Sequence, residues 1–301
     1  MHACLTIHLP DRAAIVRMLA PGETLRIGRG VDCGLRIDHP SISRAHAQLQ
    51  YRDGAWELSE LGSKNGSFVG GHRIAAGADH LLSHAGWIRL GDVYCEFAPL
   101  DDASAARAEA GRAARRAAAT AHTARLDGVH GLDELLDASL RGVLELAQCE
   151  RGFVLLQAGE GFAVRASLAL DTQRLASPEF SGSVGAVRRA LATGTSVIAN
   201  DIEGEAWLSS RASVAAAGLS ALVCIPLFDG AQPLGAIYAD RIRPGPPVTT
   251  LDQELLEAFA ERAALWIAAR RTSDLLAAHV PPPGAAADWN SIVAAHDAGA
   301  R

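Results

Sequence analysis

Residues 25–71 read LRIGRGVDCGLRIDHPSISRAHAQLQYRDGAWELSELGSKNGSFVGG, and this stretch decides the predicted fold of the first hundred residues. Short runs at 25–27 and 47–51 alternate apolar and polar side chains, and glycine-rich turns separate them. Alternation with a period of two is typical of half-buried β-strands. Many short strands with frequent turns indicate a sandwich or barrel rather than βαβ units. We therefore expect residues 1–100 to form an all-β sandwich.

Polar residues gather in three of these turns, at 28–30, 43–46 and 62–67. The candidate site residues are Gly28, Arg29, Ser43, Arg44, His46, Lys64, Asn65 and Gly66. Because all three segments fall between strands, one end of a sandwich could bring them together. The Asn65-Gly66 pair is also a strong signal for a β-hairpin, so we expect a hairpin turn there.

Apart from the glycines, the side chains of this set are hydrogen-bond donors, and the carboxylate nearest in sequence to Lys64 and Asn65 is Glu60. A dianionic phosphate suits such a cluster because it offers three acceptor oxygens and a charge near −2. Each charge-assisted hydrogen bond would contribute about 1.5–3 kcal/mol. The amide of Asn65 would in addition bind the main chain of an extended peptide. The sequence therefore predicts capture of a phosphorylated peptide.

Three motifs in this stretch resemble the signature of the forkhead-associated (FHA) domain, a β-sandwich that binds phosphothreonine. They are Gly28-Arg29, Ser43-x-x-His46 and Gly62-Ser63-x-Asn65-Gly66-Ser67, and the match spans about residues 3–98. The resemblance implies that Arg29 and Ser43 hold the phosphate and that Asn65 holds the peptide main chain. Arg44 and Lys64 occupy neighbouring contact positions, and Gly28, His46 and Gly66 are implied to be structural. The family often has a small hydroxyl residue where Lys64 stands, so the preferred flanking residues of the peptide stay open.

Composition narrows the class of protein. The chain has 301 residues, a net charge of −6 and a pI near 6.0, which argues against a general nucleic-acid or anionic-membrane binder. Five cysteines are scattered without CxxC spacing: Cys4, Cys33, Cys95, Cys149 and Cys224. This usage is typical of reduced thiols in a cytosolic protein rather than of disulfides or a zinc site. No apolar run has transmembrane length, so we expect a cytoplasmic protein.

Residues 101–127 form a segment of different character, rich in alanine and arginine. High alanine content favours a helix, yet the segment offers few large apolar side chains to bury. We expect a helical linker that pairs with its copy in a dimer. We expect Thr120 and Thr123 to lie in a flexible part of this linker, where phosphorylation of either by a kinase would let the first domain bind its own chain and block partners.

Residues 128–272 show an α+β pattern. Apolar residues recur at helical spacing over 132–147, and two hairpin-like runs, a second helix at about 184–192 and a long last helix follow. Thr250-x-x-Gln253 predicts a capping box at the start of the last helix. The order of elements indicates an antiparallel sheet flanked by helices.

Four stretches of this region resemble the GAF domain, a small-molecule sensing and dimerising module of the GAF/PAS-like type. They are CERGFVLL at 149–156, SVIAND at 196–201, LVCIPL at 222–227 and GAIYAD at 235–240. Asn200 is followed by Asp201 rather than by the residues of cyclic-nucleotide-binding members, and neither Cys149 nor Cys224 suits a bilin. A pocket is expected near 171–182 and 200–218, and the alternative is an empty domain that serves as a dimerising platform.

The tail at 273–301 contains the end of a helix and a proline run, and Trp289, Ile292 and Val293 are spaced as in a short docking helix. A frayed tail is the alternative interpretation.

The sequence contains no recognisable catalytic motif: the GxSxG, HExxH, kinase and P-loop patterns are missing. We therefore expect a non-enzymatic, bacterial signalling adaptor without a cofactor or metal. It would be a homodimer that binds a phosphothreonine-containing protein, which an upstream Ser/Thr kinase has phosphorylated. We expect neither nucleic acid nor a membrane as a partner. The alternative is a sensor whose GAF-like domain binds a small molecule while the FHA-like domain is a scaffold.

Overall fold

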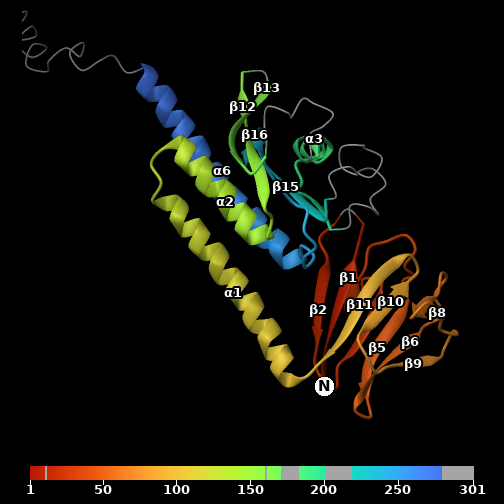
Figure 1. The fold of residues 1–301 in the computed structure, drawn as a ribbon. Helices are drawn as coiled ribbons and strands as arrows, with labels where there is room; N and C mark the ends of the chain where they lie inside the picture. Colours follow the sequence, from red (N-terminus) through yellow and green to blue (C-terminus); the bar gives the residue numbers. More distant parts are fainter. Residues whose placement is uncertain (11, 160, 171–182, 201–218, 280–301) are drawn as a thin grey trace, which may run out of the picture.

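The computed structural model of the 301-residue chain describes residues 1–10, 12–159, 161–170, 183–200 and 219–279. A long helix, α1 (Asp102–Asp127), connects two lobes and lies along the second of them, and the lobes also contact each other directly (Figure 1). None of the helices within the described ranges is long and apolar enough to cross a membrane.

The first lobe is a β-sandwich of two sheets, as the sequence predicts. Its strands are β1 (His2–His8), β2 (Ile15–Leu19), β3 (Thr24–Gly28), β4 (Leu35–Arg36), β5 (Ala47–Arg52), β6 (Ala55–Glu60), β7 (Ser67–Val69), β8 (His72–Arg73), β9 (Asp79–Leu82), β10 (Gly86–Leu90) and β11 (Val93–Leu100). The sheet orders are β2-β1-β11-β10-β7-β8 and β4-β3-β5-β6-β9. Alternate residues of β1, β6 and β11 are buried, and one apolar core lies between the sheets.

The expected hairpin at Asn65-Gly66 is wrong. β6 pairs with β5 and β9, whereas β7 pairs with β10 and β8 in the other sheet, so the 61–66 loop crosses between the sheets. A two-residue hairpin of type I′ needs positive φ at both turn residues. Here Gly66 has φ +81°, but Asn65 is not among the residues with positive φ. This crossing carries Lys64 and Asn65 over the end of the sandwich.

Helix α1 (Asp102–Asp127) follows β11 directly. The side chain of Asp101 caps it by accepting a hydrogen bond from the Ser104 N–H at 2.6 Å. One narrow face, which includes Ala119, His122 and Leu126, is buried. The segment is therefore a helix, as its alanine content predicts, and it packs along the second lobe.

The description of Thr120 and Thr123 as part of a flexible segment is wrong. Both lie within α1, and their hydroxyls donate hydrogen bonds back to Arg116 O at 3.1 Å and Ala119 O at 2.9 Å. An extended phosphopeptide around either residue would require this part of α1 to unwind, so binding to its own linker would cost the packing of α1.

The second lobe is an antiparallel sheet between two layers of helices. Its elements are α2 (Leu132–Ala147), β12 (Arg151–Ala158), β13 (Gly161–Leu168), α3 (Val184–Thr193), β14 (Val197–Ala199), β15 (Ala221–Asp229), β16 (Gln232–Arg241) and α6 (Thr250–His279). The sheet order is β13-β12-β16-β15-β14. One sheet face packs against α2 and α6, and the other packs against α3 (Figure 1). The α+β prediction is confirmed.

The expected capping box at Thr250 and Gln253 is wrong by one residue. Thr249 N donates to Asp252 Oδ2 at 2.8 Å, and Asp252 N donates to Thr249 Oγ1 at 3.3 Å. The N–H of Thr250 is not available to Gln253, because it donates to Ala14 O of the first lobe at 2.9 Å. A contact between the lobes therefore moves the cap.

Two further expectations lie outside the described residues. The pocket at 171–182 and 200–218 has only Asn200 within them, and the docking helix around Trp289 has none of its residues.

Candidate phosphopeptide site at the end of the sandwich

The first two loops of the candidate site are joined by main-chain hydrogen bonds. Arg29 N donates to Ser43 O, and Gly30 N donates to Arg44 O, both at 2.9 Å. This close approach requires a glycine at 28, because a Cβ there would lie 2.2 Å from Arg44 O. The two loops are thus held side by side, and Arg29 lies next to Ser43 and Arg44.

The third loop is joined to the second through side chains. Lys64 N donates to Ser43 Oγ at 2.9 Å, and Asn65 Nδ2 donates to Ser41 O at 2.8 Å. The hydroxyl of Ser43 accepts in this contact, so its own proton stays available for an outside acceptor. The bond from Asn65 likewise uses only one of its two amide protons.

His46 lies beneath the loops and is completely buried. Its Nδ1 accepts from Ser43 N at 3.1 Å, and its Nε2 lies 3.1 Å from Gly66 O. Since Nδ1 accepts, Nε2 carries the proton and donates to the carbonyl. Burial lowers the pKa of His46, although the contacts with Gly66 and Glu60 oppose the shift. A neutral imidazole therefore bridges the second and third loops.

Glu60 braces the third loop from inside, a role that the sequence did not reveal. Its carboxylate accepts hydrogen bonds from Ser63 N at 2.5 Å and from the Ser67 hydroxyl. Burial alone would raise the pKa of Glu60, but these hydrogen bonds outweigh it and lower the pKa. The residue is 2% exposed, so its charge points into the loop rather than toward a ligand.

The ligand-facing surface of this site is cationic. Arg29, Arg44, Lys64 and Asn65 are exposed, and Ser43 is partly exposed. Arg29 Nε makes a long contact of 3.4 Å with Ile42 O, which leaves the two terminal nitrogens of its guanidinium toward solvent. The geometry thus offers charged and neutral donors side by side, which is the arrangement that a phosphate dianion needs.

Arg73 is a further residue beside this surface that sequence reasoning missed. It is exposed, and its Nε lies 2.8 Å from the position that a Cβ on Gly66 would take. Arg73 reaches Gly66 because β8 pairs with β7, with Phe68 opposite Arg73. The sequence signal was a short turn at Gly70-Gly71, which folds the chain back toward the loop.

The second lobe shows no reactive thiol among its described residues. Burial raises the pKa of Cys149 to about 12 and raises the pKa of Cys224 further. A deprotonated thiolate is required for nucleophilic or redox chemistry at a cysteine. Cys224 is buried in the interior of the lobe, and Cys149 is half-buried and packs against the apolar core.

Comparison with known families agrees with this architecture. The FHA domain model matches residues 25–91, and the GAF domain model matches residues 131–267. Among curated proteins, the ABC transporter ATP-binding/permease protein Rv1747 of Mycobacterium tuberculosis is 36% identical over 58 residues. That stretch is 19% of this chain but only 7% of the transporter.

Solved structures similar to this chain cover the first lobe. The FHA domain of CT664 from Chlamydia trachomatis is 24% identical with a TM-score of 0.31, and the match covers 34% of this chain and 100% of that one. The N-terminal FHA domain of Rad53p from S. cerevisiae, solved with a phosphothreonine peptide, is 18% identical with a TM-score of 0.30. That match covers 35% of this chain and 99% of the other.

Proposed function

Since this chain carries an FHA domain at residues 25–91 and a GAF domain at 131–267, we propose that it is a signalling adaptor that binds phosphothreonine-containing proteins. The observation that carries the proposal is the joining of three loops at one end of the sandwich. Arg29, Ser43 and Lys64 lie there with exposed or partly exposed donors. Arg29 and Ser43 would bind the phosphate, Arg44 and Lys64 would lie beside it, and Asn65 would bind the peptide main chain.

The direct test is selection from a phosphothreonine peptide library by the wild-type chain and by Arg29→Ala. Each charge-assisted bond is worth about 1.5–3 kcal/mol, so the variant should bind selected peptides at least tenfold more weakly. Arg52→Ala is the matched control, because Arg52 is an exposed arginine at the opposite end of β5. Selection that persists in Arg29→Ala, or that does not require the phosphate, would contradict the proposal.

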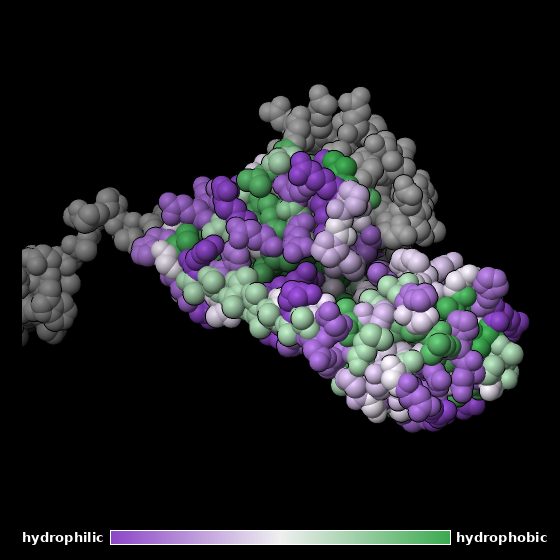
Figure 2. All heavy atoms as spheres, turned by 60° about the horizontal axis from the view of Figure 1, so that its bottom comes forward, coloured by the Kyte–Doolittle hydropathy of each residue, from purple (hydrophilic) through white to green (hydrophobic). Residues whose placement is uncertain are grey.

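The GAF domain would serve as a dimerising module, and two phosphopeptide sites in one particle would raise affinity for a doubly phosphorylated partner. The linker helix α1 would contribute to the same dimer, because exposed alanines recur along it at seven-residue intervals, at Ala103, Ala110, Ala117 and Ala124. In Figure 2, a band of weakly hydrophobic residues runs along the lower edge of the second lobe toward the first lobe. Light scattering after gel filtration should give a dimer for the wild type and a monomer for Ala117→Glu.

The remaining parts of the proposal concern context. The adaptor would work in the cytoplasm of a bacterium, downstream of a Ser/Thr kinase, and would not itself be an enzyme. The alternative function is a sensor in which the GAF domain binds a small molecule. Retained ligand-dependent thermal stabilisation in Arg29→Ala, together with no phosphopeptide selection by the wild type, would favour that alternative.

A further inference from the structure

A cavity of about 240 Å³, here called the α1 groove, lies between the FHA domain, α1 and the start of α6. One wall consists of Cys4 of β1 and of Val16 and Met18 of β2. A second wall is α1, which contributes Gly111 and Arg112. These residues and their neighbours in sequence all lie within the described ranges.

The wall contributed by the FHA domain is apolar. β1 and β2 bury Leu5 and Leu19 in the core of the sandwich, and successive residues of a strand point to opposite faces. Cys4 and Met18, which are opposite each other in the register, therefore lie on the outer face together with Val16. All three side chains are partly exposed. This face offers a surface on which a short apolar chain can pack.

Gly111 leaves space on the wall contributed by α1. A glycine in the interior of a helix costs about 1 kcal/mol relative to alanine. A Cβ at this position would meet no atom within 4 Å, so packing among the described residues does not require a glycine here. Ala108 lies three residues earlier on the same face of α1 and also lines the groove. Small residues thus keep α1 from filling the groove.

Arg112 supplies a positive charge without a partner. Its side chain is half-buried, and its Nε is buried without a hydrogen-bond partner among the described residues. Arg112 also forms no ion pair within the described ranges. A buried N–H without an acceptor costs about 1–3 kcal/mol. An acceptor that entered the groove beside Arg112 would remove this cost.

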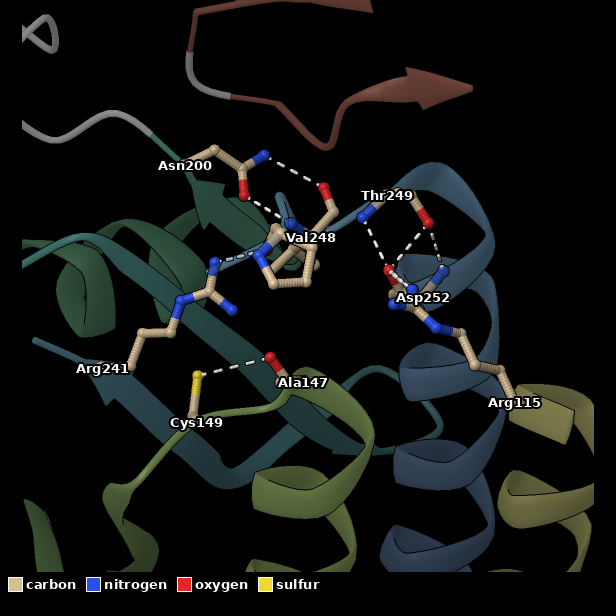
Figure 3. Close-up of polar contacts among 9 residues, drawn as sticks. Arg115, Ala147, Cys149, Asn200, Arg241, Val248, Thr249 and Asp252 are labelled. Atoms are coloured by element: carbon tan, nitrogen blue, oxygen red, sulfur yellow. Dashed lines mark hydrogen bonds and ion pairs between the residues drawn. The ribbon is translucent and has the colours of Figure 1, made fainter. Parts of the chain in front are cut away.

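The other arginine of the groove, Arg115, is already neutralised. Its Nη1 contacts both carboxylate oxygens of Asp252, at 2.6 and 2.7 Å (Figure 3). Asp252 does not line the groove, and no carboxylate is among the described residues that do. The charge left uncompensated at the groove is therefore that of Arg112.

The charge of Arg112 acts on the FHA wall as well. Burial raises the pKa of the Cys4 thiol and the charge of Glu96 adds to this shift, whereas the charge of Arg112 opposes it. Glu96 is exposed and does not line the groove. A dianion would meet one uncompensated guanidinium and the nearby Glu96 charge, so a single negative charge suits the groove better. The planar fork of a guanidinium matches a carboxylate.

We infer that the α1 groove binds a small molecule with one carboxylate and a short apolar chain. The carboxylate would accept hydrogen bonds from Arg112, and the chain would lie between Met18 and Gly111. The chain must be short, because drug-sized ligands occupy cavities of about 300–1,000 Å³. Such a ligand would touch the FHA domain, α1 and the start of α6 at once, and would stabilise their contact. The inference uses no residue of the proposed phosphothreonine site.

The experiment is an NMR titration of the isotope-labelled full chain at constant ionic strength, which follows the amide signals of Val16, Met18 and Gly111. The probes are hexanoate, 1-hexanol and acetate, which carry the charge and the chain, the chain alone, and the charge alone. Arg112→Met removes the guanidinium but keeps an unbranched side chain, and Gly111→Leu fills the groove. Arg116→Met is the matched control, because Arg116 is exposed on α1 and does not line the groove.

We expect hexanoate to cause saturable shifts in the wild type and, with the same affinity, in Arg116→Met. Arg112→Met should bind hexanoate about tenfold more weakly, since a charge-assisted hydrogen bond is lost. In the wild type, 1-hexanol and acetate should each bind more weakly than hexanoate. Gly111→Leu should show no saturable shift, and unchanged amide signals of β5 and β15 would show that both domains of this variant are folded.

Three outcomes would overturn the inference. They are the absence of saturable shifts at the groove amides of the wild type, equal hexanoate affinity in the wild type and Arg112→Met, and wild-type affinity in Gly111→Leu. None of them bears on the phosphothreonine proposal, because selection of phosphopeptides is measured separately with Arg29→Ala.

Discussion

At the scale of single residues, buried groups hold together the three loops of the proposed peptide site. Arg29 and Lys64 are exposed, but their loops keep their relative positions through His46, Glu60 and a close backbone approach at Gly28. Binding and stability should therefore respond to changes at residues that never meet the peptide.

Gly28→Ala tests the close approach of the first two loops. A Cβ at this position would lie 2.2 Å from Arg44 O, so the loops must separate. We expect a loss of about 1–3 kcal/mol in the free energy of unfolding and a marked loss of phosphopeptide affinity. Urea unfolding and peptide titration would measure the two effects. Gly86→Ala is the control, because a Cβ there meets no atom within 4 Å, and equal effects in both variants would refute the explanation.

The pH dependence of stability tests the role of His46. The pKa of this histidine is lowered from 6.5 in the folded state, so below that value the unfolded state binds more protons than the folded state. The contribution of neutral His46 is fully present above about pH 6.5 and is lost as the pH falls toward the lowered folded-state pKa. His46→Gln should show a smaller decline between pH 6.5 and 5 in urea unfolding.

Glu60 acts in the same direction at lower pH. Its pKa is lowered from 4.5, so its contribution is present above that value and is lost as the pH falls through the folded-state pKa. The pH window of the His46 contribution therefore lies above that of Glu60.

His72→Gln is the control for His46→Gln, because His72 is exposed. Its free energy of unfolding should decline with falling pH as in the wild type. A His46→Gln curve parallel to that of His72→Gln would contradict the role given to His46.

At the scale of elements, helix α1 packs against the second lobe through a small buried apolar face and through a polar contact with α6. Only a narrow face of its 26 residues is buried, and its contact with α6 includes a carboxylate, Asp252, whose side chain is 5% exposed. Without Arg115, this buried carboxylate would keep its hydrogen bonds from Thr249 but would lose its positively charged partner, which is costly.

Arg115→Ala should therefore destabilise the full chain by about 1–3 kcal/mol, less than for a fully buried pair because the side chain of Arg115 is 32% exposed. Arg116→Ala is the matched control, since Arg116 is the next residue of α1 and is exposed. Differential scanning calorimetry would compare the unfolding midpoints of the wild type, Arg115→Ala and Arg116→Ala. Equal midpoints for the two variants would show that the pair with Asp252 contributes nothing to stability.

At the scale of the whole molecule, the two domains meet through the segment 246–250, here called the strap, as well as through α1. Asn200 is important here because its amide satisfies both polar groups of Val248, whose carbonyl also accepts from Ala14 of the FHA domain. A movement at the end of β14 would thus reach the FHA domain through two hydrogen bonds.

Asn200→Ala should loosen the strap. Hydrogen exchange at the amides of Ala14, Val248 and Thr250 should become faster than in the wild type, because local opening then breaks fewer bonds. Asn200→Asp keeps the acceptor for Val248 N but loses the amide donor, and should give an intermediate rate. Unchanged exchange at Ala14 in both variants would show that Asn200 does not support the contact between the domains.

Much of this architecture could be predicted from the sequence, because its signals are local. Alternation with period two and frequent glycines indicated the sandwich, helical periodicity indicated α2 and α6, and alanine content indicated α1. The three polar turns were also predicted to meet at one end of the sandwich. Their residues lie there because turns between short antiparallel strands gather at the ends of the sheets.

Tertiary structure alone decided the features that depend on contacts between distant segments. The Asn65-Gly66 turn crosses between sheets because strand partners, rather than turn residues, determine where β6 and β7 pair. The cap of α6 moved to Thr249 because the N–H of Thr250 bonds to Ala14, over two hundred residues away in sequence. Local sequence determines which backbone conformations are favourable. Only the packing of distant segments decides which polar groups form hydrogen bonds with partners far along the chain.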